Sequence, residues 1–193
     1  MSGCLAQVTV APPGSVDQER IKKIAVLDFE WKPDDYMAKA TKENRAIELT
    51  GGSDLIPNRL AEFLASTGRY TVVGRGEVYK RLAKHNLSQT GRFDGSDVGA
   101  FGTVLEVDAV VVGRATKFHT SGWMPWNQSV VAFESRCVDV KTGEVLWTLG
   151  GERDHIGNNP SVHALQIIRD GVRQLKDKLR AGRYGKPRGK GTL

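Results

Sequence analysis

One cysteine near the start of the chain lies in a chemically informative sequence. Cys4 ends a Ser-Gly-Cys stretch at residues 2–4, and small residues before a cysteine are typical of the cleavage site of a bacterial lipoprotein signal peptide. There the small residues admit the peptidase, and the thiol receives a diacylglycerol. A chance Ser-Gly-Cys with an unmodified thiol is the alternative. Residues 5–20 favour lipidation, because they have few large apolar side chains and contain Pro-Pro-Gly, as a tether does.

The second cysteine is predicted to be structural. Cys137 alternates in register with Val131 and Phe133 on a predicted strand. We therefore expect a buried thiol that packs as a small apolar side chain. Two cysteines in the whole chain are too few for a disulfide framework.

Residues that could support catalysis or hold a metal form no known pattern. The sequence contains four histidines without metal-binding spacing, and Tyr79 stands where a Gly-x-Gly-x-x-Gly dinucleotide fingerprint would have its third glycine. Asp28 follows a predicted strand, as catalytic carboxylates often do, yet the sequence gives it no evident partner. We expect a protein that is not an enzyme and has no catalytic residue, metal site or cofactor. The histidines are His85, His119, His155 and His163.

Two tryptophans lie close together in a predicted hairpin loop. Residues 123–126 are Trp-Met-Pro-Trp, and such rings are costly to leave in water. Trp123, Met124 and Trp126 are predicted either to contact a protein partner or the membrane interface, or to fold back onto the core. The first interpretation makes these three residues the candidate partner-contact site.

The positive charge of the chain is concentrated at its C-terminal end. The net charge is +6, but residues 169–193 carry nine Lys or Arg and two Asp, so the rest of the chain is close to neutral. Nucleic-acid-binding surfaces usually mix basic and aromatic residues, and Tyr184 is the only aromatic residue in this segment. We therefore expect no nucleic acid partner. The segment is either a solvated tail or a site of attraction to anionic lipid or acidic envelope polymer.

Size and periodicity predict one α/β (α+β) domain with a mixed β-sheet flanked by helices. The chain has 193 residues, enough for a single core, and no apolar run long enough to cross a bilayer as a helix. We expect a tether at 1–20, a domain at 21–181 and a disordered basic tail at 182–193. The predicted strands are 21–30, 70–73, 108–118, 128–140 and 145–153, and the predicted helices are 57–67, 76–86, about 96–105 and a long helix starting at Asn159-Pro160.

Four local patterns give sharper predictions. Residues 108–118 contain four consecutive apolar residues, which is typical of a central strand covered on both faces. Gly143 supplies the positive φ that the turn between the last two strands needs. Residues 31–52 are predicted to be a long polar loop. The last helix carries an apolar stripe for core packing or for a partner helix, formed by Leu165, Ile168, Val172, Leu175 and Leu179.

Four segments resemble the CsgG-like family, named for a component of curli secretion. Residues 69–75 (RYTVVGR) are similar to its strand-to-helix segment, with Gly74 where the family usually has Glu. Residues 107–113 (VDAVVVG) are similar to its central strand. The turn at 82–91 (LAKHNLSQTG) and the closing hairpin at 138–147 (VDVKTGEVLW) complete the set, which spans roughly residues 22 to 180.

The resemblance implies a fold like the anticodon-binding domain, enlarged by extra strands. It also implies a lipidated protein in the periplasm, anchored to the outer membrane and acting by contact with an envelope protein in assembly or secretion. A homo-oligomer is left open. The smaller family members include LpoB-like activators of penicillin-binding proteins, which gives one alternative. Pore-forming members insert long amphipathic hairpins, whereas the connection between Phe118 and Val130 is too short for two membrane-spanning strands. We therefore expect that this domain alone forms no channel, and a curli-type pore is kept as the second alternative.

We predict that the complete gene product carries an upstream signal peptide and that Cys4 becomes its acylated first residue. Mass spectrometry of the protein extracted from the envelope is expected to show a lipid-modified N-terminal cysteine, and Cys4→Ser should release the protein from the membrane fraction. An unmodified Cys4 in envelope-extracted protein would contradict this prediction. Cys137→Ser is the matched control and should leave membrane attachment unchanged.

Overall fold

The fold is described by a computed structural model covering residues 6–12, 17–33, 46–48, 52–121, 128–156 and 159–184. These residues form a single domain of mixed β-sheet and helices, which confirms the predicted fold class. The strands are β1 (Gln7–Val10), β2 (Lys23–Val26), β3 (Glu30–Trp31), β4 (Ala46–Glu48), β5 (Thr71–Val72), β6 (Ala109–Ser121), β7 (Gln128–Asp139) and β8 (Val145–Ile156). The helices are α2 (Gly52–Ser66), α3 (Arg75–Lys84), α4 (Val98–Leu105) and α5 (Pro160–Tyr184).

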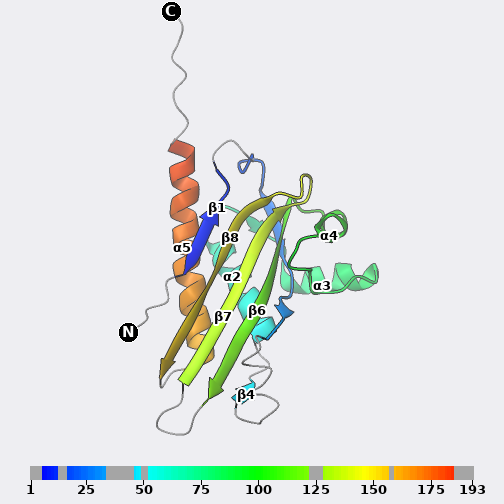
Figure 1. The fold of residues 1–193 in the computed structure, drawn as a ribbon. Helices are drawn as coiled ribbons and strands as arrows, with labels where there is room; N and C mark the ends of the chain where they lie inside the picture. Colours follow the sequence, from blue (N-terminus) through cyan, green and yellow to red (C-terminus); the bar gives the residue numbers. More distant parts are fainter. Residues whose placement is uncertain are drawn as a thin grey trace, which may run out of the picture.

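The sheet combines an antiparallel half with a parallel half. Its order is β1-β8-β7-β6-β2-β5, and β3 and β4 also pair with β6. The strands β6, β7 and β8 form an antiparallel meander, whereas β2 is parallel to both β6 and β5. Figure 1 shows the three long strands side by side, with α2 and α5 behind them.

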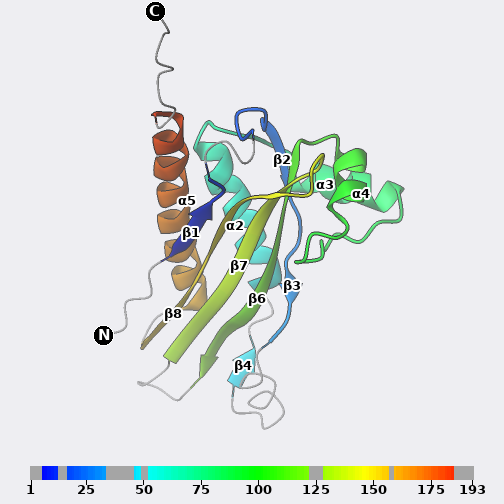
Figure 2. The ribbon, with the colours of Figure 1, turned by 45° about the horizontal axis from the view of Figure 1, so that its top comes forward.

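The strand β6 is central and is buried on both faces, as predicted. Val111 and Ala115 belong to one apolar cluster, with residues of α2 and α5, and Val110 and Val112 belong to a second cluster, with residues of α3 and α4. Each of these four side chains is fully buried. The helices therefore divide between the two faces of the sheet, and Figure 2 shows α3 and α4 beside one end of the meander.

The closing hairpin and the last helix also confirm the sequence analysis. Gly143 has a φ of 73° in the β7–β8 turn, and the Asn159 side chain accepts a hydrogen bond from the backbone N–H of Ser161 at 2.8 Å, at the start of α5. The apolar stripe of α5 packs into the core rather than facing a partner helix. Its buried members are Ile168, Val172 and Leu175, joined by Ala164 and Ile167.

The N-terminal strand corrects the predicted tether. β1 pairs antiparallel with β8, and Ala6 and Val8 are buried in the larger core cluster. Gln174 and Lys178 of α5 donate hydrogen bonds to the carbonyls of these two residues. The expectation of a tether through residue 20 is therefore wrong for residues 6–11, because they alternate between the core and solvent as an edge strand does.

Other differences concern the limits of elements. The strand predicted at 21–30 is divided into β2 and β3. Val26 lies opposite Val111 and Glu30 lies opposite Arg114. The chain therefore advances four residues from β2 to β3 while β6 advances three, so the pairing is interrupted as it is at a β-bulge. The predicted loop at 31–52 contains β4, α2 starts at residue 52 rather than 57, and α5 extends to Tyr184, past the expected boundary at 181.

Two glycines of α4 provide a test of how this helix packs. A Cβ on Gly102 would lie 2.2 Å from a methyl carbon of Val140, whereas a Cβ on Gly99 would meet nothing within 4 Å. Gly102→Ala should destabilise the fold by about 1–3 kcal/mol through overpacking. Gly99→Ala should be neutral or stabilise by up to about 1 kcal/mol, because alanine favours the helix. Urea unfolding of both variants checks this, and equal effects would contradict the close approach of α4 to Val140.

Candidate functional site

A guanidinium group joins three elements at the end of β2. Arg75, the first residue of α3, donates hydrogen bonds from Nε to Oδ1 of Asn58 on α2 and from Nη1 to the carbonyl of Val26 on β2, both at 2.8 Å. Its Nη2 contacts the Asp28 carboxylate and the Tyr79 hydroxyl. The guanidinium also lies over the Tyr79 ring, 4.9 Å from the centroid. Arg75 is therefore fully engaged in holding the elements together.

This cluster gives Asp28 the partners that the sequence did not reveal. The Tyr79 hydroxyl donates a hydrogen bond to Oδ1 of Asp28 at 3.0 Å, and the side chains of Asp28 and Arg75 are only 15% and 13% exposed. Burial raises the pKa of Tyr79 above its ordinary value, so its hydroxyl stays protonated at neutral pH. A carboxylate held in this way between a cation and a hydroxyl is suited to fixing geometry.

A groove of about 740 Å³ runs beside this cluster, between α2 and the edge strand β5. Its lining includes the apolar residues Leu55 and Ala61 from α2 and Val72 and Val73 from the β5 region. It also includes four charged residues, which are Asp54, Arg59 and Glu62 of α2 and Arg75 of α3. A surface that combines apolar and charged residues is typical of protein–protein contacts.

The strand that borders this groove ends the sheet. The backbone N–H groups of Thr71 and Val73 donate to carbonyls of β2 at 2.8 and 2.9 Å. Because peptide groups alternate in direction along a strand, the N–H and C=O of Val72 point away from β2, and β5 is the last strand of the described sheet on that side. A strand edge of this kind can receive backbone hydrogen bonds from another chain.

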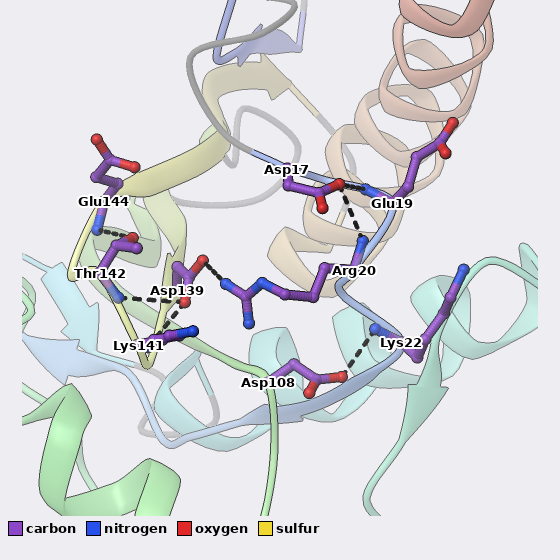
Figure 3. A network of polar contacts seen from close by, with 9 residues as sticks. All are labelled: Asp17, Glu19, Arg20, Lys22, Asp108, Asp139, Lys141, Thr142 and Glu144. Atoms are coloured by element: carbon purple, nitrogen blue, oxygen red, sulfur yellow. Dashed lines mark hydrogen bonds and ion pairs between the residues drawn. The ribbon is translucent and has the colours of Figure 1, made fainter.

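A second polar cluster attaches the segment before β2 to the end of β7, which lies two strands away in the sheet. Figure 3 shows Arg20 pointing toward Asp139 at the end of β7, where the two side chains form an ion pair. The Asp139 carboxylate is fully buried and also accepts hydrogen bonds from the backbone N–H groups of Lys141 and Thr142 at 2.8 and 3.4 Å. Asp108 repeats the pattern by accepting from two consecutive N–H groups, at residues 22 and 23.

The pKa of Asp139 reflects a competition between burial and hydrogen bonding. Burial alone raises the pKa of the carboxyl, but the hydrogen bond from Arg20 and those from the Lys141 and Thr142 backbone outweigh it, so the pKa lies below its ordinary value. The carboxylate is therefore ionised at neutral pH. It ties the N-terminal segment to the β7–β8 turn.

Most candidate residues from the sequence analysis lie outside the part of the chain that the structure describes. They are Cys4, Trp123, Met124 and Trp126. Cys137 is fully buried, as predicted, and burial raises the pKa of its thiol, so it is a poor nucleophile at neutral pH.

The histidines lie apart from both polar clusters. His155 and His163 have ring centroids 6.2 Å apart, and burial lowers the pKa of His163. Within the part of the chain that the structure describes, no group of three His, Cys, Asp or Glu side chains is placed to hold a metal ion. None of the described helices is both long and apolar enough to cross a membrane.

The fold is thus a single mixed α/β domain with two polar clusters that join its elements and one groove at a sheet edge. No protein-family model matches the sequence, and a comparison with curated proteins finds no match. Solved structures share the fold. The PelC dodecamer from Paraburkholderia phytofirmans matches with a TM-score of 0.59 and 14% identity, over 90% of this chain and 97% of that one.

A second solved structure has a similar degree of likeness. The lipoprotein GNA1162 from Neisseria meningitidis matches with a TM-score of 0.58 and 16% identity, over 81% of this chain and 99% of that one. At these identities the likeness establishes a common fold.

Removing the charge of Asp139 should destabilise the domain. Asp139→Asn loses the ion pair with Arg20 and weakens the buried hydrogen bonds, so we expect a loss of about 2 kcal/mol at pH 7. Because the folded-state pKa is depressed, this stabilisation is present above about pH 4 and is lost as the pH falls through the folded-state value. Urea unfolding at several pH values measures both effects.

The matched control is Asp17→Asn. Asp17 also accepts backbone hydrogen bonds, from the N–H groups of Glu19 and Arg20 at 3.2 and 3.3 Å, but in an exposed turn. The Asp17→Asn variant should change the free energy of unfolding by less than about 1 kcal/mol. If the two variants were equally stable at pH 7, Asp139 would not be the main attachment of this segment.

Proposed function

We propose that this protein is a periplasmic lipoprotein, held at the outer membrane through Cys4, that acts by contact with other proteins and catalyses no reaction. The observation that carries the proposal is the groove between α2 and β5. It combines apolar lining residues, charged lining residues and the edge strand of the described sheet in one place. A partner that adds backbone hydrogen bonds at Val72 and buries apolar side chains along α2 would satisfy all three features.

The first occupant that we propose is a second copy of the chain. The lining of the groove carries both charge signs, because Asp54 and Glu62 lie in it together with Arg59. Such a lining suits a partner surface of mixed charge, such as another face of the same chain, better than a strongly acidic or strongly basic partner. PelC, which has the same fold, is a dodecamer. If the groove receives a different face of the neighbouring copy, the same contact can repeat around a closed ring, as in cyclic oligomers.

The absence of catalysis is also part of the proposal. Asp28, the carboxylate best placed after a strand, is already bonded to Arg75 and Tyr79. The same cluster is better explained as the joint between α2, β2 and α3.

We also propose that the chain belongs to the CsgG-like family and has a role in envelope assembly or secretion. The four similar segments at residues 69–75, 82–91, 107–113 and 138–147 support it. The alternative is an LpoB-like activator of a peptidoglycan synthase, and the second alternative is a curli-type pore. A stable monomer that captures a cell-wall synthase would favour the first alternative. Reproducible channel currents from purified lipidated protein in planar bilayers would favour the second.

The groove can be tested by placing a charge in it. Ala65 is an exposed residue of α2 that lines the groove, and arginine keeps helix propensity high, so Ala65→Arg should fold normally but block the contact. Light scattering coupled to size-exclusion chromatography is expected to show an oligomer for the wild type and a shift of at least about tenfold in its dissociation constant for the variant.

The matched control is Ala83→Arg, an exposed alanine of α3 outside the groove. It should assemble as the wild type does. A wild type that stays monomeric at high concentration, or an Ala83→Arg variant that dissociates as much as Ala65→Arg, would rule out self-association through this groove.

A further inference from the structure

A second pocket, of about 350 Å³, lies between the end of α2, the start of β5 and the second half of α5. Leu64 of α2 and Leu175 of α5 form part of an apolar wall. Four cationic side chains surround the pocket, and they are Lys22, Arg69, Lys176 and Arg180. This basic pocket shares no lining residue with the groove described above.

The basic pocket has an unbalanced charge. No Asp or Glu is among the described residues that line it, and none of its four cations forms an ion pair with a described carboxylate. Elsewhere on the helices, arginines are paired, as Arg59 is with Glu62 and Arg173 with Asp170. Cations gathered around one cavity repel one another, and a bound anion would relieve that repulsion.

Arg69 is held in place at the basic pocket. Its Nη2 donates to the carbonyl of Gln18, and its guanidinium lies 5.7 Å from the centroid of the Tyr70 ring. Its Nε is enclosed by protein and has no hydrogen-bond partner among the described residues, so a ligand in the pocket cannot reach that atom. The guanidinium of arginine is suited to bonding an oxyanion, and a bond to a ligand here would use its Nη groups.

The C-terminal end of α2 does not cancel this positive charge. A helix end carries a partial charge of about −0.5, against four whole positive charges around the pocket. The last turn also bonds its own carbonyls, because the Ser66 and Thr67 hydroxyls donate to the carbonyls of Phe63 and Leu64 at 2.7 and 2.6 Å. The pocket is therefore positive overall.

We propose that the basic pocket binds the phosphate group of an organic phosphate whose apolar part lies against the leucine wall. A phosphate monoester carries up to about two negative charges and three strong acceptor oxygens, which matches several converging cations better than a single carboxylate would. The ligand is either the headgroup of an anionic phospholipid or a free organophosphate. This site goes beyond the proposed protein contact and does not depend on it.

The test is calorimetric titration of the full chain with glycerol phosphate and with dihexanoyl phosphatidic acid, a soluble short-chain phospholipid. Dihexanoyl phosphatidylcholine is the zwitterionic control. Lys176→Gln combined with Arg180→Gln removes two exposed or half-exposed cations and should leave the fold intact. We expect this double variant to weaken binding at least about tenfold, since each basic residue contributes on the order of 1 kcal/mol toward an anionic headgroup.

Arg173→Gln is the matched control, because Arg173 is a 70%-exposed cation of the same helix that is paired outside the pocket. It should bind as the wild type does. Arg69→Gln should also weaken binding, and a melting curve checks that this variant is folded. Binding should fall as salt is added.

The two sources are distinguished by the ratio of affinities. Phosphatidic acid binding more than about tenfold tighter than glycerol phosphate indicates a lipid headgroup, and similar affinities indicate a free organophosphate; both support the site. The proposal is overturned if neither ligand binds at about 10 mM. It is also overturned if phosphatidylcholine binds as well as phosphatidic acid, or if Arg173→Gln weakens binding as much as the double variant.

Discussion

The burial of both faces of β6 is the constraint on which the rest of the structure depends. A strand with Val110 and Val112 on one side and Val111 and Ala115 on the other needs apolar cover in both directions. The connections provide it. From β2 the chain passes through α2 to β5 on one side, and from β5 it returns through α3 and α4 to β6 on the other side. Crossovers of the same hand in opposite directions place their helices on opposite faces.

This reversal also creates the position at which α/β sheets commonly bind ligands. That position is the crevice at the carboxyl ends of the strands where the direction of the connections changes. Here it lies at the end of β2, and Arg75 occupies it together with Asp28 and Tyr79. Arg75 also lines the open groove beside this crevice, whereas the basic pocket lies at the C-terminal end of α2 and shares no lining residue with that groove.

Local patterns in the sequence were sufficient to predict most of the helices and long strands. The four apolar residues of β6, the Gly143 turn and the stripe of α5 each reflect contacts that repeat with the period of their own element. β1 was missed because it has only four residues and its partner, β8, is about 140 residues away. A short stretch before Pro12-Pro13 has the composition of a tether, and only the distant edge makes it a strand.

The candidate sites were less predictable, for the same physical reason. Arg75 and Asp28 are 47 residues apart, and Arg20 and Asp139 are 119 apart. The basic pocket takes residues from three separate segments. Such groupings depend on the path of the chain in space, so no spacing in the sequence indicates them. The one available signal was the position of Asp28 after a strand, and nothing in the sequence indicated its partner.

The position of β1 has a mechanical consequence for a chain held at its N-terminus. Tension applied near residue 4 reaches the short β1–β8 ladder first, and the hydrogen bonds of Gln18 and the Arg20–Asp139 pair only afterwards. If β1 detaches, the stretch from Gln7 to Asp17 can extend to a total length of up to about 40 Å before the load reaches Gln18. In the proposed membrane-anchored protein, the domain would then move away from the membrane by less than this length, because the folded stretch already spans part of it, while the central sheet stayed folded. β1 would thus act as an extensible segment, which shortens again when the strand returns to the edge of β8.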